Sequence, residues 1–594
     1  MNCNFLLSTG FPSHSARFVV LVLAHVLSGC GHDSGSTSAP TRSLENVEEI
    51  AWVSELNRAE NLLLQLTPQL REFSEEVTAG RGPEVDSAAV SGWKPVLDQV
   101  QSFDHAKFSF VAGGFSPKNP GHFETRVNFE GLAKTKSGHW IAIRTKQKVV
   151  WNVECDGEQS VGDWKVIKWE QAEFRVSERD GLMFRDVTKS AIPAEEQPSL
   201  FSSVHDQFIV RSFRGEKLEL PYPELEPYFS TDATMFHPSV SVVDINGDGW
   251  DDLYLMTRWE RNRLFVNQQD GTFKNEAEHY GLDVGLTSCA IFADFDNDGD
   301  KDVFLGRCFA PSLLLINEDG KFVDRTKTNI AGPLPGFITS ASAADFNNDG
   351  QLDLYLCSYT SIGSHVGNVE TAAKFMPLPH AEGLIDWFTQ ASPADLWLDR
   401  PGPPNRLLKN VGGGKFKKSA VIQEVWANTF QSTWSDYDQD GDVDLYLSND
   451  FAPDYLFRND GDLGFSDVTS RMGGDAMKGY GMGVTWGDYD GDGWQDLYVS
   501  NMYSKAGKRI IGQMQADLDE RYLLSANGNR LFRNRRGRRL DLVSGEKPTD
   551  VRVTKAGWSW GGQFCDFDND GWLDLYVASG FYTAPQEITC HTDL

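Results

Sequence analysis

The sequence predicts a mainly β protein, in which a β-propeller follows a small α+β domain. Two observations predict it. An acidic motif, Asp-x-Asp/Asn-x-Asp-Gly-x-x-Asp followed by a short apolar run, begins at Asp244, Asp294, Asp345, Asp436, Asp488 and Asp566. Ahead of these copies, residues 104–180 alternate apolar and polar side chains, which is typical of antiparallel strands. We therefore assign residues 44–180 to the α+β domain and residues 181–594 to the propeller.

Residues 1–29 are typical of an export signal, because the apolar run 18–27 is too short to span a bilayer. The run ends in Leu-Ser-Gly-Cys, which resembles a bacterial lipobox and implies cleavage before Cys30 and lipidation of its sulfur. Residues 30–43 are small and polar, as in a flexible tether. We expect a lipoprotein of the outer membrane or cell surface, with secretion or a periplasmic location as the alternative.

The α+β domain begins with residues 44–78, whose apolar residues recur at helical spacing and predict one or two helices. A helix packed on a curved antiparallel sheet fits this order, and the layout resembles NTF2-like domains. Such domains can hold a ligand in a cavity, although no residue here identifies one. We expect four tryptophans of the strands to belong to the core: Trp140, Trp151, Trp164 and Trp169.

Propeller blades are indicated by the spacing of the acidic motifs, whose first aspartates lie 50, 51, 91, 52 and 78 residues apart. A unit of about 50 residues fits a four-stranded blade. Each motif would join two strands, and a second strand-turn-strand element such as NRLFVNQQDGTF completes the blade. The two long gaps indicate insertions near residues 358–404 and 503–528. We favour seven blades, with residues 184–239 supplying the seventh or closing the last one; six or eight remain open.

Metal binding is predicted by the oxygen-bearing residues at positions 1, 3, 5 and 9 of each motif, which would repel one another without a cation. Ca²⁺ suits such a set, because it accepts six to eight oxygen ligands in flexible geometry. No His or Cys occupies a ligand position, which argues against Zn²⁺. Position 7 varies, so we expect it to bind through its backbone carbonyl. The predicted ligands of about six Ca²⁺ ions are Asp244, Asn246, Asp248, Trp250, Asp252, Asp294, Asp296, Asp298, Asp300, Asp302, Asp345, Asn347, Asp349, Gln351, Asp353, Asp436, Asp438, Asp440, Asp442, Asp444, Asp488, Asp490, Asp492, Trp494, Asp496, Asp566, Asp568, Asp570, Trp572 and Asp574.

The main competing interpretation is an EF-hand, which needs a bidentate Glu at position 12. Position 12 is apolar in all six copies, for example Leu255 and Val577, so this interpretation fails. The third copy carries Asn347 and the fewest carboxylates, and we expect it to be the weakest site.

The net charge of the chain limits the classes of partner that it could bind. The formal net charge is −30, and six Ca²⁺ ions would leave about −18, which disfavours nucleic acid and anionic lipid as partners. Contact with a membrane would then occur only through the lipid anchor, and we expect a monomer.

Cys289 and Cys308 flank the second motif almost symmetrically, so the hairpin could bring them together as a disulfide or leave them as buried thiols.

Residues 183–582 resemble FG-GAP/VCBS repeats, which build the propellers of integrin alpha subunits. Phrases such as GMGVTWGDYDGDGWQDLYVSN and SNDFAPDYLFRND are most similar to bacterial relatives of cartilage acidic protein, which often carry an ASPIC/UnbV module. The resemblance implies a calcium-bound propeller outside the cytoplasm. Because the sequence ends at Leu594, soon after the sixth motif, we do not expect the role of that module to apply to it.

The expected function is binding of, or adhesion to, a protein or glycan, with Ca²⁺ structural and no catalysis. No metalloprotease, nucleophile-elbow or phosphate-loop motif is present in the sequence. The alternative is an extracellular polysaccharide lyase or hydrolase built on the propeller. Its candidate residues lie in the first insertion: His365, His380, Asp386 and Asp395.

Overall fold

The computed structural model divides into two compact units, with the boundary between Asp186 and Val187. It describes residues 47–579 apart from residues 86–87, 91, 120, 157–159, 183, 203, 224, 226–238, 258, 360–368, 375, 391–400, 478 and 504–526. The predicted export signal, the tether and Cys30 therefore lie outside the described residues, as does most of the second predicted insertion. No helix in the described ranges is long and apolar enough to cross a membrane.

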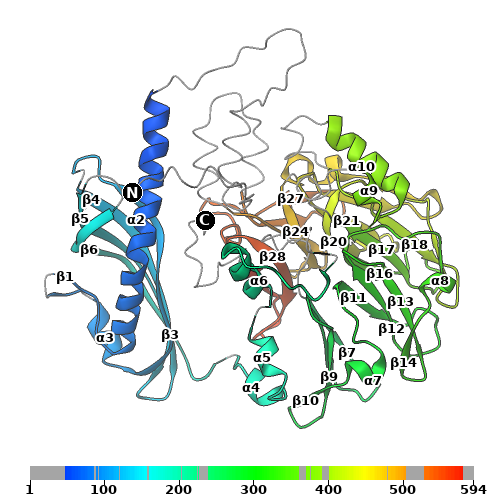
Figure 1. Ribbon diagram of the computed structural model, residues 1–594, viewed down its shortest axis with the longest axis horizontal. Coiled ribbons are helices and arrows are strands. Elements are labelled where there is room, and N and C mark those ends of the chain that lie inside the picture. The colour runs from blue at the N-terminus through cyan, green and yellow to red at the C-terminus, as the bar shows by residue number, and fades with distance from the viewer. Residues whose placement is uncertain are drawn as a thin grey trace, which may run out of the picture. The chain divides into compact units, whose positions relative to one another are not determined.

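The N-terminal unit is one long helix on a four-stranded antiparallel sheet (Figure 1). Strand order follows chain order, and helix α2 packs against β3. Leu62, Leu66, Leu70 and Phe73 recur along one face of α2 and are buried against the sheet. The elements are α2 (Val47–Thr78), β1 (Glu84–Val85), β2 (Ala88–Ala89), α3 (Trp93–Leu97), β3 (Val100–Phe115), β4 (His122–Thr135), β5 (Trp140–Asp156) and β6 (Ser160–Arg179).

The tryptophans of this sheet are largely core residues, as predicted. Trp151 is fully buried, and its indole donates a hydrogen bond of 2.9 Å to Thr125 Oγ1. Trp164 and Trp169 pack against the same core, which also holds Trp93 of α3. Trp140, at the start of β5, is half-buried and lies outside this cluster.

The second unit is a β-propeller made of small antiparallel sheets, six of which lie in the described residues and are called blades 1 to 6 here. In blades 1 to 5, the four main strands follow chain order as a simple meander, and in blade 3 the short strand β15 adds in parallel to β19. The strands of the six blades are, in turn, β7 (Ser239–Val243), β8 (Asp252–Met256), β9 (Arg263–Asn267) and β10 (Phe273–Asn275); β11 (Thr287–Ala293), β12 (Asp302–Arg307), β13 (Leu313–Glu318) and β14 (Lys321–Asp324); β16 (Ile338–Ala344), β17 (Asp353–Ser358), β18 (Arg406–Asn410) and β19 (Phe416–Lys418), with β15 (Ile330–Ala331) added at the edge; β20 (Asn428–Ser435), β21 (Asp444–Asp450), β22 (Tyr455–Asn459) and β23 (Phe465–Asp467); β24 (Gly481–Gly487), β25 (Asp496–Asn501), β26 (Arg530–Asn534) and β27 (Leu540–Leu542); β28 (Ser559–Cys565) and β29 (Asp574–Ser579).

Consecutive blades pack through their first strands: β7 contacts β11, and the series continues through β16, β20 and β24 to β28. Figure 1 shows these sheets side by side, from green in blade 1 to red in blade 6. The interfaces from blade 1 to blade 5 each hold an apolar cluster; Val303 and Leu305 of blade 2, for instance, share a cluster with Tyr254 and Leu264 of blade 1. The repeated strand-turn-strand pattern therefore builds a series of blades with a separate core between neighbours.

One end of the propeller axis is filled by side chains from every blade. Phe309, Phe337, Phe430 and Met482 belong to one cluster, with Trp560 packed against it. Helices α6 (Val204–Phe213), α9 (Val369–Ala372) and α10 (Leu378–Gln390) contribute to the same cluster. The described part of the first insertion thus contributes α9 and α10 to this cluster.

The favoured seventh blade is wrong for the described residues. The stretch expected to supply it forms α4 (Thr188–Ala191), α5 (Gln197–Leu200) and α6 instead of strands. Phe208 and Ile209 of α6 are buried, so the apolar run FIVRSF packs as one face of a helix. Blade 6 accordingly has two strands in the described part of the chain.

Short helical turns follow the outer strands of several blades. They arise where Thr or Asn/Glu-rich segments lead to the next blade, as at Thr326 and Thr469. These elements are α7 (Ala277–Tyr280), α8 (Thr326–Asn329), α12 (Thr469–Met472) and η5 (Gly474–Met477), whereas η4 (Gly461–Leu463) is the turn between β22 and β23.

Candidate metal centres

Each acidic motif forms the loop between the first two strands of a blade, and its position-1 aspartate holds the loop closed. The two carboxylate oxygens accept hydrogen bonds of 2.7–3.1 Å from the backbone N–H groups of positions 5 and 6 in all six copies. The glycine at position 6 has φ between 78° and 103° in every copy, where a side chain would be strained. This local chemistry explains the invariant Asp and Gly of the repeat.

The position-9 aspartate begins the second strand and is buried in blades 1 to 5. In blade 1, Asp252 accepts hydrogen bonds from the N–H of Ile245 at position 2 (2.9 Å) and of Asn267 at the end of the third strand (2.7 Å). The second contact recurs in blades 2 to 5 at 2.7–2.9 Å. One carboxylate therefore joins the loop to the third strand.

Burial makes these position-9 carboxylates unusual acids. Desolvation raises the pKa of Asp302, Asp353 and Asp496 to about 7 and that of Asp444 to about 8, although backbone hydrogen bonds oppose the shift. A nearby cation would offset the desolvation and favour the ionised form.

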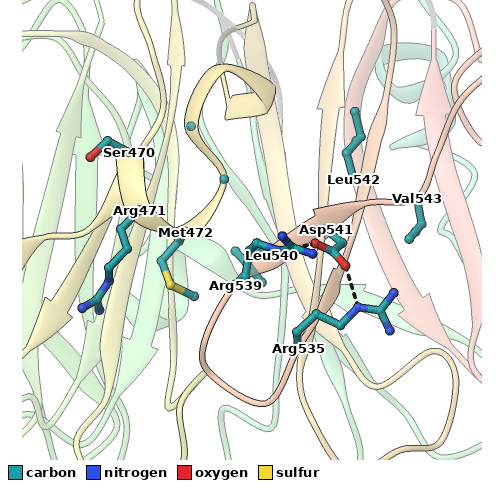
Figure 2. Close-up of a pocket in the computed structure, with 11 residues that line it drawn as sticks. Ser470, Arg471, Met472, Arg535, Arg539, Leu540, Asp541, Leu542 and Val543 are labelled. Atoms are coloured by element: carbon teal, nitrogen blue, oxygen red, sulfur yellow. Dashed lines mark hydrogen bonds and ion pairs between the residues drawn. The ribbon is translucent and has the colours of Figure 1, made fainter.

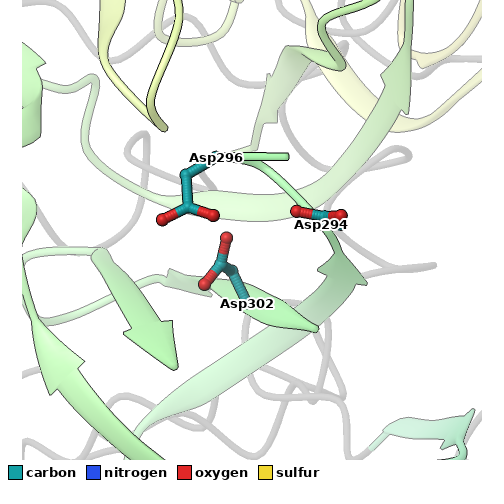
Figure 3. Close-up of side chains that lie close together, drawn as sticks. All are labelled: Asp294, Asp296 and Asp302. Atoms are coloured by element: carbon teal, nitrogen blue, oxygen red, sulfur yellow. The ribbon is translucent and has the colours of Figure 1, made fainter. Parts of the chain in front are cut away.

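Three carboxylates converge in four of the six motifs, with ligand oxygens within 4.8 Å of one another. Figure 3 shows Asp294, Asp296 and Asp302 of blade 2 turned toward a common point. Positions 1, 3 and 9 meet in blades 2, 4 and 6, and positions 1, 3 and 5 meet in blade 5. The remaining two copies carry Asn246 and Asn347 at position 3, so an amide oxygen takes the place of one carboxylate.

The loops also contain buried acceptor atoms that no donor of the described residues satisfies. They are Asp300 Oδ1, Asn347 Oδ1, Gln351 Oε1, Asp438 Oδ1, Asp490 Oδ1 and Asp496 Oδ2. An unsatisfied buried oxygen is costly, and a bound cation would remove that cost. The donor set is entirely oxygen, which fits Ca²⁺ and does not fit a metal that needs nitrogen or sulfur ligands.

The copies are not equivalent, because basic side chains reach two of them. In blade 5, Arg533 lies 2.7 Å from Asp490 and 3.0 Å from Asp492. In blade 3, Lys409 Nζ lies 3.0 Å from Asp349. Both residues come from the third strand and stand directly before its last asparagine.

In three copies position 7 is a tryptophan, whose indole ring offers no oxygen atom to a metal ion. Trp250 and Trp572 are 48% and 58% exposed, and Trp494 is half-buried. The backbone N–H of each donates to the position-5 carboxylate at 2.8–3.1 Å. Coordination through the position-7 carbonyl stays a prediction.

Blade 6 differs at position 9. Asp574 is exposed and accepts a hydrogen bond from Phe567 N–H (3.2 Å), but no third strand of the described residues provides the second donor. Its loop nevertheless brings Asp566, Asp568 and Asp574 together.

The asparagine that ends the third strand was missed as a site residue by sequence reasoning. Besides its backbone contact to position 9, its amide spans two blades. Asn459 Nδ2 of blade 4 donates to Phe346 O in the loop of blade 3 (2.7 Å) and to Val443 O of its own loop (3.3 Å). Asn410 and Asn534 do the same one blade before and after. The recurrent second Asn of NRLFxN was the available signal.

The proposed bridge between Cys289 and Cys308 is not formed, and both are free thiols. A bulge between Thr287 and Cys289 places Cys289 opposite Gly306 instead of opposite Cys308. The Cys308 thiol lies 3.0 Å from Ser288 Oγ and is buried. Of the two outcomes that the symmetric spacing left open, a disulfide or two thiols, the structure has two thiols, because the bulge shifts the pairing of the two strands at this point.

The candidate catalytic residues are only partly described. His365 and Asp395 lie outside the described residues. His380 Nε2 lies 3.3 Å from Arg406, and its ring packs edge-on against Trp426. Burial lowers the pKa of His380, and the Arg406 charge lowers it further. Asp386 lies further along α10 and is exposed.

Comparison with known proteins places these loops in a recognised repeat. The FG-GAP-like repeat matches residues 244–305, 309–356, 436–499 and 518–577. Cartilage acidic protein 1 of Homo sapiens is 23% identical over 414 residues, which cover 60% of this chain and 58% of that protein. The Xenopus tropicalis protein is 20% identical over 428 residues, covering 65% and 62%, and the Mus musculus protein is 23% identical over 414 residues, covering 60% and 59%. The chain thus spans about three fifths of the length of these relatives.

Proposed function

We propose, for a chain that carries FG-GAP-like repeats and is homologous to cartilage acidic protein 1, an exported binding protein whose propeller is stiffened by about six Ca²⁺ ions. The ligand would be a protein or a glycan, held on a propeller face or by the insertions. The acidic loops would serve as scaffold, and the protein would not be an enzyme.

The observation that carries this proposal is the position of the acidic loops in the blades. Each position-1 carboxylate closes its own loop, and each buried position-9 carboxylate of blades 1 to 5 ties that loop to the third strand. An ion bound there would hold the inner hairpin, the loop and the third strand together. Its role would be rigidity, which keeps a binding surface in one conformation and lowers the entropic cost of binding.

An exported location supports calcium occupancy. Loops of this kind would fill with Ca²⁺ where the ion is plentiful, since extracellular modules commonly have dissociation constants of about 10⁻⁴–10⁻³ M. The apolar run of residues 18–27 and the Leu-Ser-Gly-Cys sequence favour a lipid anchor at Cys30, with a secreted or periplasmic form as the alternative.

The experiment is binding of the purified mature chain to intact surfaces: cells and immobilised extracellular glycans or proteins. We expect binding in millimolar Ca²⁺ and its loss on chelation, with recovery when Ca²⁺ is restored. Turnover of a polysaccharide without any stable binding would contradict the proposal and favour the enzyme alternative. If a His380→Ala variant retained all of that turnover, His380 would not be a catalytic residue of such an enzyme.

A further inference from the structure

A continuous series of buried hydrogen bonds connects the acidic loop of blade 4 with that of blade 5. Tyr437, at position 2 of the blade-4 loop, donates its N–H to the position-9 carboxylate of Asp444 (3.1 Å). The carbonyl of Tyr437 accepts a bond from Nδ2 of Asn534 (2.8 Å), and the N–H of Asn534 donates to Asp496, the position-9 carboxylate of blade 5 (2.7 Å). All four residues are at most 1% exposed. Predicted ligands of two blades are therefore joined through two intervening residues.

The same series of bonds occurs at the two preceding boundaries between blades. Its contacts are Asn459 Nδ2 to Phe346 O (2.7 Å) and Asn459 N–H to Asp444 (2.8 Å), then Asn410 Nδ2 to Phe295 O (2.7 Å) and Asn410 N–H to Asp353 (2.7 Å). The position-2 residues bond in turn to position 9 of their own loops, Phe295 N–H to Asp302 at 3.0 Å and Phe346 N–H to Asp353. One series of bonds thus runs from Asp302 of blade 2 to Asp496 of blade 5.

The series does not reach the loop of blade 1. Asn317, the corresponding residue of blade 2, donates its N–H to Asp302 (2.9 Å), but its side-chain oxygen accepts from the N–H of Gly320 in its own turn (2.8 Å). Within the described residues, no hydrogen bond joins the amide of Asn317 to the blade-1 loop. The described part of blade 6 has no third strand, so the series is traced over blades 2 to 5. The blade-1 loop therefore provides an internal comparison.

A second set of contacts crosses the same three boundaries on the exposed side of the loops. Position 4 carries an amide side chain in blades 2, 3 and 4, with φ between 56° and 63°, and each amide donates to the loop of the next blade. The contacts are Asn297 Nδ2 to Gly350 O (2.9 Å), Asn348 Nδ2 to Asp442 Oδ1 (2.9 Å) and Gln439 Nε2 to Gly493 O (2.7 Å). Blade 1 has Gly247 at this position, which offers no side chain for such a contact.

Both sets of contacts reach groups that position the predicted ligands. The peptide that carries Gly493 O also carries the N–H of Trp494, which donates to the position-5 carboxylate of Asp492 (3.1 Å). Tyr437 stands between the ligands at positions 1 and 3 of its own loop. An ion bound in one loop would fix these residues and, with them, the bonds to the next loop. Part of the ordering that the next ion requires would then already be complete, which is a physical basis for coupling.

We propose that the loops of blades 2 to 5 bind Ca²⁺ cooperatively, with Asn410, Asn459 and Asn534 as the positioning residues that connect them. The inference rests on the calcium binding of the proposed function and adds that these four loops fill together. The loop of blade 1 would fill independently. Blades 2 to 5 would then stiffen as a unit over a narrow range of Ca²⁺ concentration, because binding in one loop raises the affinity of its neighbours.

The outer strands of blades 4 and 5 offer a control for this connection. A pocket of about 550 Å³ lies there, between α12 of blade 4 and β27 of blade 5 (Figure 2). Asp541 is paired in it with Arg535 at 2.6 Å and with Arg539 at 2.5 Å, and all three residues belong to blade 5 (Figure 2). Asp541→Asn therefore weakens polar contacts of the same blade without touching the bonds between the loops.

The test measures the Ca²⁺ affinity of the blade-5 loop while the blade-4 loop is intact or weakened. Ca²⁺ is titrated against bound terbium, whose luminescence is sensitised by Trp494 in a Trp250→Phe, Trp572→Phe background of the whole chain. Each titration is repeated in about 1 M KCl, where a Debye length of about 3 Å screens direct repulsion between the loops.

Two substitutions separate the ion from the connection. Asp440→Asn weakens the blade-4 loop, because it removes the charge of an exposed position-5 ligand but keeps an oxygen for the N–H of Asp442. Asn534→Ala removes the amide that reaches Tyr437 but keeps the backbone N–H that reaches Asp496. The blade-5 ligands thus keep their own donor in both variants.

We expect Asp440→Asn to lower the Ca²⁺ affinity of the blade-5 loop about fivefold or more, at both salt concentrations. In a Gln439→Ala, Asn534→Ala background, the same change should have less than about a twofold effect. Asp541→Asn should leave the fivefold effect intact, and Asp248→Asn, at position 5 of the blade-1 loop, should not alter the blade-5 affinity. A thermal transition in saturating Ca²⁺ shows that each variant is folded. Gln439 is exposed, so Gln439→Ala alone, which should already reduce the effect, replaces a double variant that does not fold.

Three results would overturn the proposal: an unchanged blade-5 affinity in Asp440→Asn, an equal fall with and without the two amides, or an equal fall caused by Asp248→Asn. If the loops bound neither terbium nor Ca²⁺, the proposed function would lose its calcium scaffold as well. Calcium-dependent binding to intact surfaces by a chain whose loops fill independently would leave the proposed function standing while the cooperative connection failed.

Discussion

At the residue scale, the position-9 aspartates link protonation to metal binding. Desolvation raises the pKa of Asp302 to about 7 and that of Asp444 to about 8, far above the value of about 3.9 for an unfolded chain. The metal-free folded state therefore binds protons that the unfolded state has lost, and its stability falls as pH rises through this window. Ca²⁺ must displace those protons.

We accordingly predict that calcium affinity rises with pH between about 6 and 8 and levels off above. Calorimetry in buffers of different ionisation enthalpy should detect proton release at pH 6.5 and little at pH 9. Asp444→Asn should reduce the released protons, and affinity independent of pH across this range would show that these carboxylates are not ligands.

Arg533 is predicted to compete with the ion in blade 5, because its guanidinium occupies the carboxylates of Asp490 and Asp492. Arg533→Gln should therefore raise the affinity of that loop several-fold. In a Trp250→Phe, Trp572→Phe background, Trp494 is the tryptophan that remains at position 7 of an acidic loop, so the change in sensitised terbium luminescence between Arg533 and Arg533→Gln reports mainly on this loop. Arg325→Gln, which breaks an ion pair with Glu318 elsewhere, is the control. Weaker terbium binding in Arg533→Gln would instead assign Arg533 a role in orienting the ligands.

Residue spacing predicted the acidic loops well, since positions 1, 3 and 9 follow from chain geometry within one hairpin. Spacing could not predict which residues from other strands contact these loops. The donors to position 9 come from a third strand as many as 57 residues away, at Asn410 for Asp353. The bulge that separates Cys289 from Cys308 is likewise a property of strand pairing that spacing alone does not reveal.

At the scale of elements, the asparagine that ends the third strand joins neighbouring blades. Asn459 is 2% exposed, and its amide satisfies carbonyls of two loops at once. Losing it would leave both buried carbonyls unpaired, at about 1–3 kcal/mol.

We predict that Asn459→Ala lowers the free energy of unfolding of the propeller by about 1–3 kcal/mol. Asn267→Ala should cost less than about 1 kcal/mol, because Nδ2 of Asn267 donates only to Asp251 O of its own blade, at 3.1 Å and exposed, and its Oδ1 accepts from the exposed N–H of Gln269. Urea denaturation compares the two. Equal losses would mean that the link between blades adds no stability.

The type of element was predicted correctly where the hydrophobic periodicity extends over a long segment. It was predicted wrongly where the apolar run is short. The alternation across residues 104–180 and the repeated hairpins gave the observed sheets. Residues 204–213 carry an apolar run that suits a strand or a helix, and only packing of Phe208 and Ile209 decides for α6. Within the described part of residues 184–239, helices therefore stand where strands of a seventh blade were expected.

At the scale of the molecule, the charge and the fold have one explanation. Many of the acidic residues behind the formal charge of −30 lie in loops that hold the blades, and neutralising ions would let those loops close without mutual repulsion. The predicted β-propeller is confirmed as a series of small antiparallel sheets. Which residues gather at the end of the axis depends on long-range packing, and the sequence gives no sign of it.

Thermal unfolding measured against free Ca²⁺ tests the central claim most directly. Because ions that bind only the folded state stabilise it by mass action, the melting temperature of the propeller should rise steadily with the logarithm of free Ca²⁺ and fall on chelation. The transition of the N-terminal unit, which has no acidic loop, should stay fixed. Identical propeller transitions in chelator and in millimolar Ca²⁺ would contradict a structural role for the acidic loops.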